Sequence, residues 1–168
     1  MRKMVLSILV DNTAGVLSRV AGLFSRRGYN IDSLTVAATE NPLYSRMTVV
    51  ARGDEQILEQ ISKQLAKLED VREIKELTAE DSVCRELVMV KVEAGSDKRQ
   101  AIIATSSIFR AKVVDISTDS MMIELTGNQS KVDAFINLLG DVKILEMVRT
   151  GVTGLLRGSG DMSELFED

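Results

Sequence analysis

The feature that most constrains the fold is an order of strand-like and helix-like segments that occurs twice along the 168-residue chain. Each half begins with an apolar run, continues through a segment with helical periodicity and two strand-like runs, and ends with a second helical segment and a closing strand. This β-α-β-β-α-β order is typical of the ferredoxin-like unit, so we predict an α+β protein with two such units in tandem. Few residues are identical between the halves, and a coincidence of two common α+β orders would give the same pattern.

Hydrophobic spacing sets the expected elements of the first half. The apolar residues Leu17, Val20, Ala21 and Phe24 recur at the spacing of one helix face, and Gly28 follows where that helix should end. We expect strands at residues 4–10, 31–39, 44–52 and 71–77, a first helix beginning at residue 14 or 15, and a second helix after residue 54.

The second half contains the strongest strand signal of the chain, at residues 86–94. Further strands are expected at 112–117, 121–126 and 143–149, with helices at 97–109 and after residue 128. Glycines at positions 151, 154, 158 and 160 interrupt any helix in the last part of the chain. The predicted organisation is an N-terminal domain at residues 1–78, a linker at 79–84, a second ferredoxin-like βαββαβ domain at 85–158, and a mobile acidic tail at 159–168.

The composition excludes several classes of function. The chain has no histidine and one cysteine, Cys84, which excludes imidazole-dependent catalysis, a thiolate zinc site and an internal disulfide. A net charge of −4 argues against nucleic-acid binding, which depends on clustered Lys and Arg. No apolar stretch approaches the roughly 18 residues that a membrane span needs. We expect a cytoplasmic protein with no metal site, no membrane contact and no nucleic-acid partner.

The first strand of each half is apolar at nearly every position, at residues 5–10 and 88–92. Such strands are covered on both faces of their sheet, whereas the two helices of a ferredoxin-like unit cover only one face. The other face and the sheet edges must therefore pack on the other half of the chain or on a second chain. Because twofold pairing is the commonest symmetry, we expect a homodimer.

The turn between the first strand and the first helix has unusual residues for its place, with Asp11 and Asn12 followed by a small-residue segment that ends in Gly15. The unpaired backbone N–H groups of the helix start, together with the helix dipole, form a site for a small carboxylate. Gly15 lets a ligand approach the backbone, and Asn12 offers both a donor and an acceptor, which suits a zwitterion. In the alternative interpretation, Asp11 and Asn12 only cap the helix.

A second candidate segment, Gly28-Tyr29-Asn30-Ile31, connects the first helix to the second strand. Taken alone, it is typical of a glycine C-cap followed by a turn. The second strand could, however, lie beside the second strand of a neighbouring chain. Asn30 and Ile31 would then face the Gly15 turn of that neighbour, and two copies would form one pocket.

In this spacing, residues 11–17 and 28–31 resemble the signature of the ACT domain, a small-molecule regulatory module of amino-acid metabolism. More narrowly, residues 17–24 and 28–36 resemble the small, regulatory subunit of acetolactate (acetohydroxyacid) synthase. The first predicted domain, residues 1–78, is thus identified as an ACT domain. Further matching runs extend the resemblance over nearly the whole chain, to Gly158; they are residues 45–48, 59–77, 85–92 and 149–151.

The resemblance implies a non-catalytic subunit that binds and activates a separate catalytic large subunit of acetolactate synthase. Thiamine diphosphate, Mg²⁺ and FAD are expected only in that partner, and no cofactor is expected in this chain. The resemblance also implies feedback inhibition by valine or another branched-chain amino acid.

The effector is expected between the ACT domains of a homodimer. Its carboxylate would lie on the turn that matches Asn12, Gly15 and Val16, and the partner would contribute the positions that match Asn30 and Ile31. The implied effector-binding residues are Asn12, Ala14, Gly15, Val16, Leu17, Asn30 and Ile31.

The second half lacks an Asn-x-x-Gly turn at the matching position, residues 94–98, so we expect one effector site per ACT pair. Residues beyond Val83 are expected to have a structural or coupling role. A free-standing amino-acid-sensing ACT regulator of another enzyme or of transcription is an alternative. An independent small enzyme and a nucleic-acid binder of the same topology are further alternatives, which turnover without a partner or salt-dependent binding would reveal.

Overall fold

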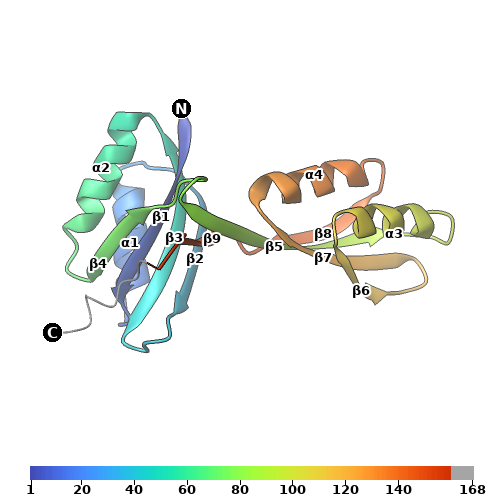
Figure 1. Cartoon of the computed structure of the whole chain (residues 1–168), viewed down its shortest axis with the longest axis horizontal. Helices are drawn as coiled ribbons and strands as arrows, with labels where there is room; N and C mark the ends of the chain where they lie inside the picture. Colours follow the sequence, from blue (N-terminus) through green and yellow to red (C-terminus); the bar gives the residue numbers. More distant parts are fainter. Residues whose placement is uncertain (160–168) are drawn as a thin grey trace. The chain divides into compact units, whose positions relative to one another are not determined.

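The computed structural model describes residues 1–159. These residues fall into two compact units, which are residues 1–84 together with the segment from Val152 onward, and residues 85–151. Each unit has an antiparallel sheet with two helices on one of its faces, as Figure 1 shows. The structure therefore confirms the predicted α+β fold with two βαββαβ units in tandem.

The sheet of the first unit has the strand order β2-β3-β1-β4. Every neighbouring pair is antiparallel. In this order β1 and β3 are interior strands, and β2 and β4 form the two edges. The elements of this unit are β1 (Arg2–Asp11), α1 (Val16–Arg26), β2 (Ile31–Ala38), β3 (Tyr44–Gly53), α2 (Glu55–Ala66) and β4 (Val71–Glu76).

Alternating side chains of β1 build the core beneath α1 and α2. Leu6 and Ile8 point to this core and are at most 1% exposed. Burying a large aliphatic side chain of this kind contributes about 1.5–3 kcal/mol to folding. The buried stripe of α1 differs from the predicted one, because Leu17 is 47% exposed. The helix begins at Val16, and its buried face is rotated by about one residue, to Val16, Val20, Leu23 and Phe24.

The interior strands of this sheet are also largely buried on the helix-free face, as the apolar pattern of β1 predicted. Leu9 and Val50 point to that face, and each is 1% exposed. Part of the cover comes from the chain after Gly151, because the Thr35 hydroxyl donates a hydrogen bond to the carbonyl oxygen of Val152 at 3.1 Å.

A short strand that the sequence pattern missed, β9 (Thr153–Leu156), pairs with β5 (Ser82–Glu93). A Cβ atom on Gly154 would lie 2.6 Å from Sγ of Cys84 and 2.8 Å from the carbonyl oxygen of Val83, so only glycine permits this close approach. The observed grouping differs from two expected boundaries. Residues 152–158 belong to the first unit and not to the second domain, and β5 begins within the expected linker. Beyond residue 159, the expected tail lies outside the described residues.

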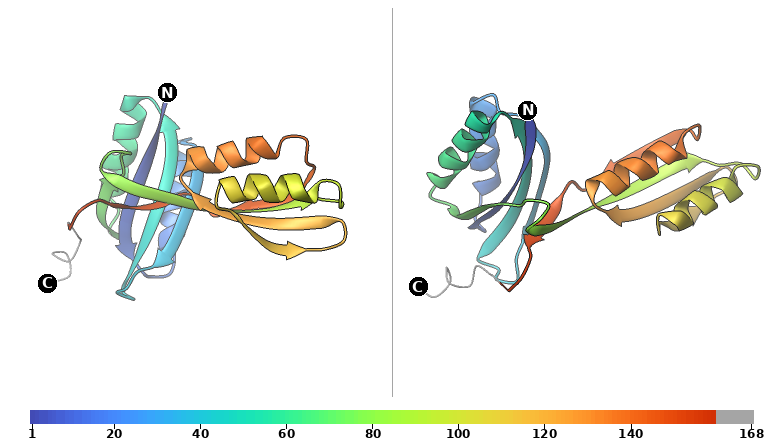
Figure 2. Two further views of the ribbon diagram at one scale, coloured as in Figure 1. Left: turned by 45° about the vertical axis from the view of Figure 1, so that its right-hand side comes forward. Right: turned by 45° about the horizontal axis from the view of Figure 1, so that its top comes forward.

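The second unit has the strand order β6-β7-β5-β8, and Figure 2 shows its two helices side by side on one face of the sheet. Phe135 is fully buried and contacts Phe109 edge to face, with 5.5 Å between ring centroids. The remaining elements of this unit are α3 (Arg99–Ile108), β6 (Lys112–Ile116), β7 (Ser120–Gly127), α4 (Gln129–Leu139) and β8 (Ile144–Arg149).

An ion pair with a buried carboxylate links β8 to β5 in the second unit. Glu86 on β5 is 4% exposed, and its carboxylate accepts two hydrogen bonds from the guanidinium of Arg149 on β8. Arg149 also donates to Asp133 on α4 at 3.2 Å. Because an unpaired buried charge is costly, the Glu86 carboxylate depends on Arg149.

Helix caps provide a test of the local energetics of both units. Oδ1 of Asp54 accepts a hydrogen bond from the backbone N–H of Ile57 at 2.8 Å, at the start of α2. Lys98, at the N-cap of α3, makes no such side-chain bond. We expect Asp54→Ala to lower the free energy of unfolding of the first unit by about 1 kcal/mol, and Lys98→Ala to leave that of the second unit nearly unchanged. Urea unfolding followed by amide hydrogen exchange measures both, and equal losses would contradict the assigned caps.

Candidate functional site

The start of α1 is built differently from the starts of α2 and α4. Its N-cap is Gly15, which has a left-handed backbone conformation (φ +86°) and no capping side chain, and its first turn contains no acidic residue. In α2 and α4, by contrast, the side chains of Asp54 and Asn128 accept hydrogen bonds from backbone N–H groups of the first turn. The first-turn N–H donors of α1 are therefore available to an external anion.

Asp11 and Asn12 have other partners, so the interpretation that they cap the helix is wrong. The Asp11 carboxylate forms a bidentate pair with Arg72, at 2.7 Å to Nε and 3.0 Å to Nη2. Nδ2 of Asn12 donates to the carbonyl oxygen of Pro42 at 2.9 Å, and its backbone N–H donates to the carbonyl oxygen of Leu43. Asn12 thus fixes the β2–β3 loop against the turn that leads into α1.

The turn residues differ in what they can offer to a ligand. The side chains of Asn12, Ala14 and Leu17 are exposed, and Gly15 is open to solvent. The side chain of Val16 is 4% exposed and packs in the core, so only its backbone can contact a ligand. Backbone donors, one amide side chain and one exposed aliphatic side chain suit a small aliphatic molecule that carries a carboxylate.

Arg19 also belongs to this site, although its sequence context is typical of a solvated helix face. A Cβ atom on Gly15 would lie 2.9 Å from Nη1 of Arg19, which places the guanidinium beside the turn. Nε of Arg19 donates to the carboxylate of Asp70 at 2.5 Å, and this hydrogen bond raises the pKa of Arg19 above its ordinary value. Asp70 precedes β4 and is 51 positions from Arg19, so no local sequence signal could reveal the pair.

The second candidate segment lies at the opposite end of the same sheet. Asp11 pairs with Tyr44 at one end of β3, whereas Ile31 pairs with Ala51 near the other end. Helix α1 has 11 residues and therefore separates the two segments by about 16 Å. Asn30 directly precedes β2, and its Nδ2 donates to Oδ1 of Asp32 on that strand at 3.2 Å. One chain therefore does not bring Asn30 and Ile31 to the Gly15 turn, and a shared pocket requires a second copy.

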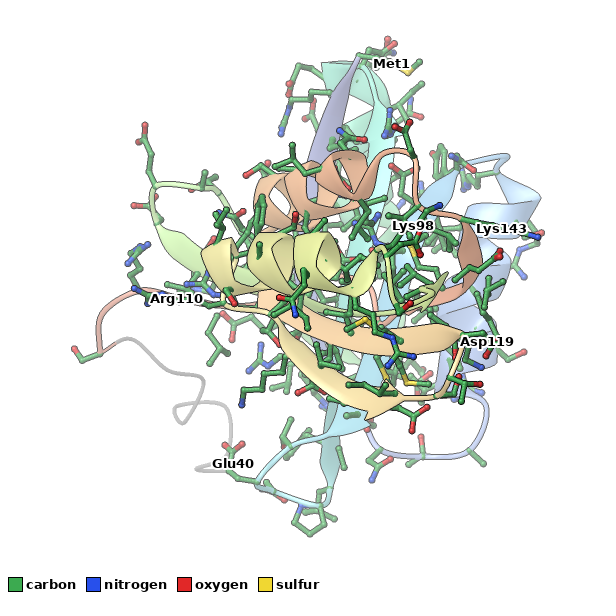
Figure 3. The ribbon with its side chains drawn as sticks, turned by 90° about the vertical axis from the view of Figure 1, so that its right-hand side faces the viewer. Met1, Glu40, Lys98, Arg110, Asp119 and Lys143 are labelled. Carbon is green, nitrogen blue, oxygen red and sulfur yellow. The ribbon has the colours of Figure 1, made fainter. Side chains whose placement is uncertain are left out.

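The matching turn of the second unit does not reproduce the Gly15 geometry. Lys98, which precedes α3, has a right-handed backbone (φ −100°, ψ −15°), and Gly95 has no positive φ. Figure 3 shows Lys98 and Arg110 at the two ends of α3, with Asp119 and Lys143 on the Lys98 side. The left-handed glycine turn before a helix is thus a feature of the first unit.

Residues 1–159 offer neither a metal site nor a membrane-spanning helix. In this part of the chain, no three His, Cys, Asp or Glu side chains are grouped so that they could hold a metal ion. None of its helices combines the length and the apolar character that crossing a membrane requires.

Two family models match this chain. The AHAS (acetohydroxyacid synthase) small subunit-like ACT domain matches residues 6–73, and the small subunit of acetolactate synthase matches residues 85–158. The probable acetolactate synthase small subunit of Methanothermobacter thermautotrophicus is 50% identical over 159 residues, covering 94% of this chain and 95% of that protein. The acetolactate synthase isozyme 3 small subunit of Escherichia coli is 48% identical over 155 residues, covering 92% and 95%.

A solved structure agrees with these matches. The acetolactate synthase small subunit from Thermotoga maritima has a TM-score of 0.86 and 41% identity, over 95% of this chain and all of that one. The fold and the family match of the first unit define an ACT-domain protein with a second ferredoxin-like unit. The chain belongs to the family of acetolactate synthase small subunits. Binding of an effector by the seven candidate residues stays a prediction.

The Gly15 turn provides a direct test of the candidate site. In Gly15→Asp, a carboxylate and a Cβ atom occupy the space beside Arg19, where a ligand carboxylate would lie. We expect calorimetry to detect no valine binding to this variant. Gly158→Asp is the matched control, because Gly158 has nearly the same backbone conformation (φ +87°) with open space around it. If the control also loses valine binding while both variants stay folded, the position of the site is wrong.

Proposed function

We propose that this protein is the non-catalytic regulatory subunit of acetolactate synthase, acting in branched-chain amino-acid biosynthesis. In this proposal it binds the catalytic large subunit in the cytoplasm and raises its activity. Membership of the small-subunit family supports the proposal, as does the absence of histidine from the sequence. Thiamine diphosphate, Mg²⁺ and FAD belong to the large subunit in this account, and this chain contributes no catalytic group.

The regulatory ligand is valine or another branched-chain amino acid, and the open start of α1 is the observation that supports this most strongly. The ligand carboxylate accepts hydrogen bonds from the backbone N–H groups after Gly15, and the helix dipole adds to the attraction. The exposed side chain of Leu17 lies at the same turn and offers an apolar contact for the aliphatic part. A ligand of this size reaches at best about −1.5 kcal/mol per heavy atom, and we expect micromolar to millimolar affinity.

A homodimer of ACT domains completes the pocket. Strand β2 is an edge of its sheet, so its outer backbone groups are available to pair with β2 of a second copy. Such pairing would bring Asn30 and Ile31 of one copy toward the Gly15 turn of the other. Valine would then contact two protomers and favour one arrangement of the dimer, which the large subunit senses. A coupling free energy of about 1–3 kcal/mol between effector and partner is typical of such systems.

A mixing assay tests the proposed activity. Purified chain is added to the acetolactate synthase catalytic subunit of the same organism, and acetolactate formation is measured with and without valine. We expect the chain to raise the rate and valine to lower the raised rate, with no effect of valine on the catalytic subunit alone. Valine binding without co-purification or activation would favour the alternative of a free-standing amino-acid-sensing regulator, and acetolactate formation by the chain alone would contradict a non-catalytic role.

Complementation between two variants tests the shared pocket. Asn30→Ala is expected to weaken valine binding from across the dimer, whereas Gly15→Asp removes binding at the turn. A mixed dimer of these variants retains one intact pairing of a Gly15 turn with Asn30, so it should bind valine at one site with the wild-type affinity, which neither homodimer does. Calorimetry on co-refolded, tag-separated mixed dimers measures this. Mixed dimers that form but bind valine no more tightly than the Asn30→Ala homodimer would show that the pocket is not shared.

A further inference from the structure

Two ion pairs link β1, β4 and α1 at the end of the first unit where the Gly15 turn lies. Asp11 pairs with Arg72, and Asp70 pairs with Arg19. The backbone N–H of Asp11 also donates to the carbonyl oxygen of Asp70 at 2.9 Å, so the two carboxylates come from neighbouring segments. The two pairs have similar exposure to solvent. In each, the carboxylate side chain is about one-fifth exposed and the arginine side chain about half. They differ in place, since only Arg19 lies beside Gly15.

The position of Arg19 is electrostatically unusual. Arg19 follows Gly15 by four positions, and its backbone N–H donates to the Gly15 carbonyl oxygen at 3.0 Å, which places Arg19 one turn into the helix. Cations are unfavourable near a helix N-terminus, and the first turn of α1 has neither an acidic residue nor a capping side chain. The positive charge of the Arg19 guanidinium and the positive end of the helix dipole therefore lie close together beside Gly15. Asp70 is the carboxylate that offsets this potential in the free chain.

An effector carboxylate at the Gly15 turn would enter the same positive region. Nη1 of Arg19 lies on the Gly15 side of the guanidinium, and Nε is engaged by Asp70. Asp70 holds Nε, so a second carboxylate can still reach Nη1 and Nη2 in the bidentate geometry that a guanidinium favours. It would then lie close to the like charge of Asp70, and each carboxylate weakens the binding of the other to Arg19. The arginine of the pair is about half exposed, so the exchange of its carboxylate partner carries no large desolvation cost.

We propose that Asp70 and the effector carboxylate compete for Arg19, so that effector binding replaces an internal carboxylate with an external one. The inference rests on the proposed effector site and adds two residues to it. Arg19 is a binding residue, and Asp70 is a positioning residue that weakens effector binding in the free chain. The exchange also releases the start of β4 from α1, because the Arg19–Asp70 pair joins the residue before β4 to that helix.

Valine affinity measured by calorimetry on the full chain tests the exchange. Asp70→Asn is expected to bind valine about three- to fivefold more tightly, the size expected for a half-exposed ion pair. Arg19→Gln is expected to bind at least about threefold more weakly. In the double variant, the gain from Asp70→Asn should disappear, because there is no guanidinium left to compete for.

Asp11→Asn is the matched control, because it removes the same charge at the same end of the sheet but breaks the pair with Arg72 and not that with Arg19. It should change valine affinity by less than Asp70→Asn does, and thermal unfolding should show that all variants are folded. The exchange is overturned if Asp70→Asn binds no more tightly than Asp11→Asn, or if its gain persists without Arg19. Arg19→Gln alone provides a second measurement that leaves Asp70 unchanged, and unaltered affinity there also overturns the inference.

Failure of the proposed function gives a different result from failure of the exchange. If the wild-type chain, folded and dimeric, binds neither valine, leucine nor isoleucine, the effector site itself is wrong and the inference falls with it. If the wild-type chain binds valine and the Asp70 and Arg19 variants behave like the control, only the exchange is wrong.

Discussion

The burial of β1 on both faces is the constraint on which the first unit depends. This strand is paired on both sides and is apolar at nearly every position, so helices must cover one face and other chain segments the opposite face. The chain after Gly151 lies on that face of the sheet at β2, where the Thr35 hydroxyl donates to the carbonyl oxygen of Val152. A strand held in this way fixes the position of its last residue, Asp11, and therefore of the turn that starts α1. The candidate site is rigid at its base for this reason, even though the turn itself lies at the surface.

The function proposed for this turn depends on the lack of a capping side chain at the start of α1. Two other helices of the described chain use an Asp or Asn side chain to cap their first turn. In α1 the corresponding position is a left-handed glycine, and the nearby Asp11 and Asn12 are held by Arg72 and by the β2–β3 loop. An uncapped helix start at a rigid turn retains donors that a ligand carboxylate can satisfy. The second half of the proposed pocket lies at the far end of the sheet, so a ligand that contacts both halves must bind two copies.

Most of the fold could be predicted from residue pattern, because its elements are local and strongly periodic. Apart from the start of β5, the expected strands agree with the observed ones to within two residues.

The features that the sequence pattern missed have physical causes. Glycines at 151, 154 and 158 indicated only that no helix forms there, yet Gly154 permits the close approach that lets β9 pair with β5. The Asp11–Arg72 and Arg19–Asp70 pairs join residues 61 and 51 positions apart, and no periodicity in the sequence encodes such contacts. The candidate turn was visible because its residues are adjacent, whereas the charges around it were not.

In the proposed dimer, one amino-acid ligand contacts the Gly15 turn of one copy and the start of β2 of another. The most direct measurement is the nuclear Overhauser effect between bound valine and the methyl groups of the chain, with the protein saturated by isotope-labelled valine. The account predicts cross-peaks from valine to the methyl groups of both Leu17 and Ile31, which a single chain holds at opposite ends of its sheet. Cross-peaks to only one of these residues, or to neither, in a saturated sample would contradict it.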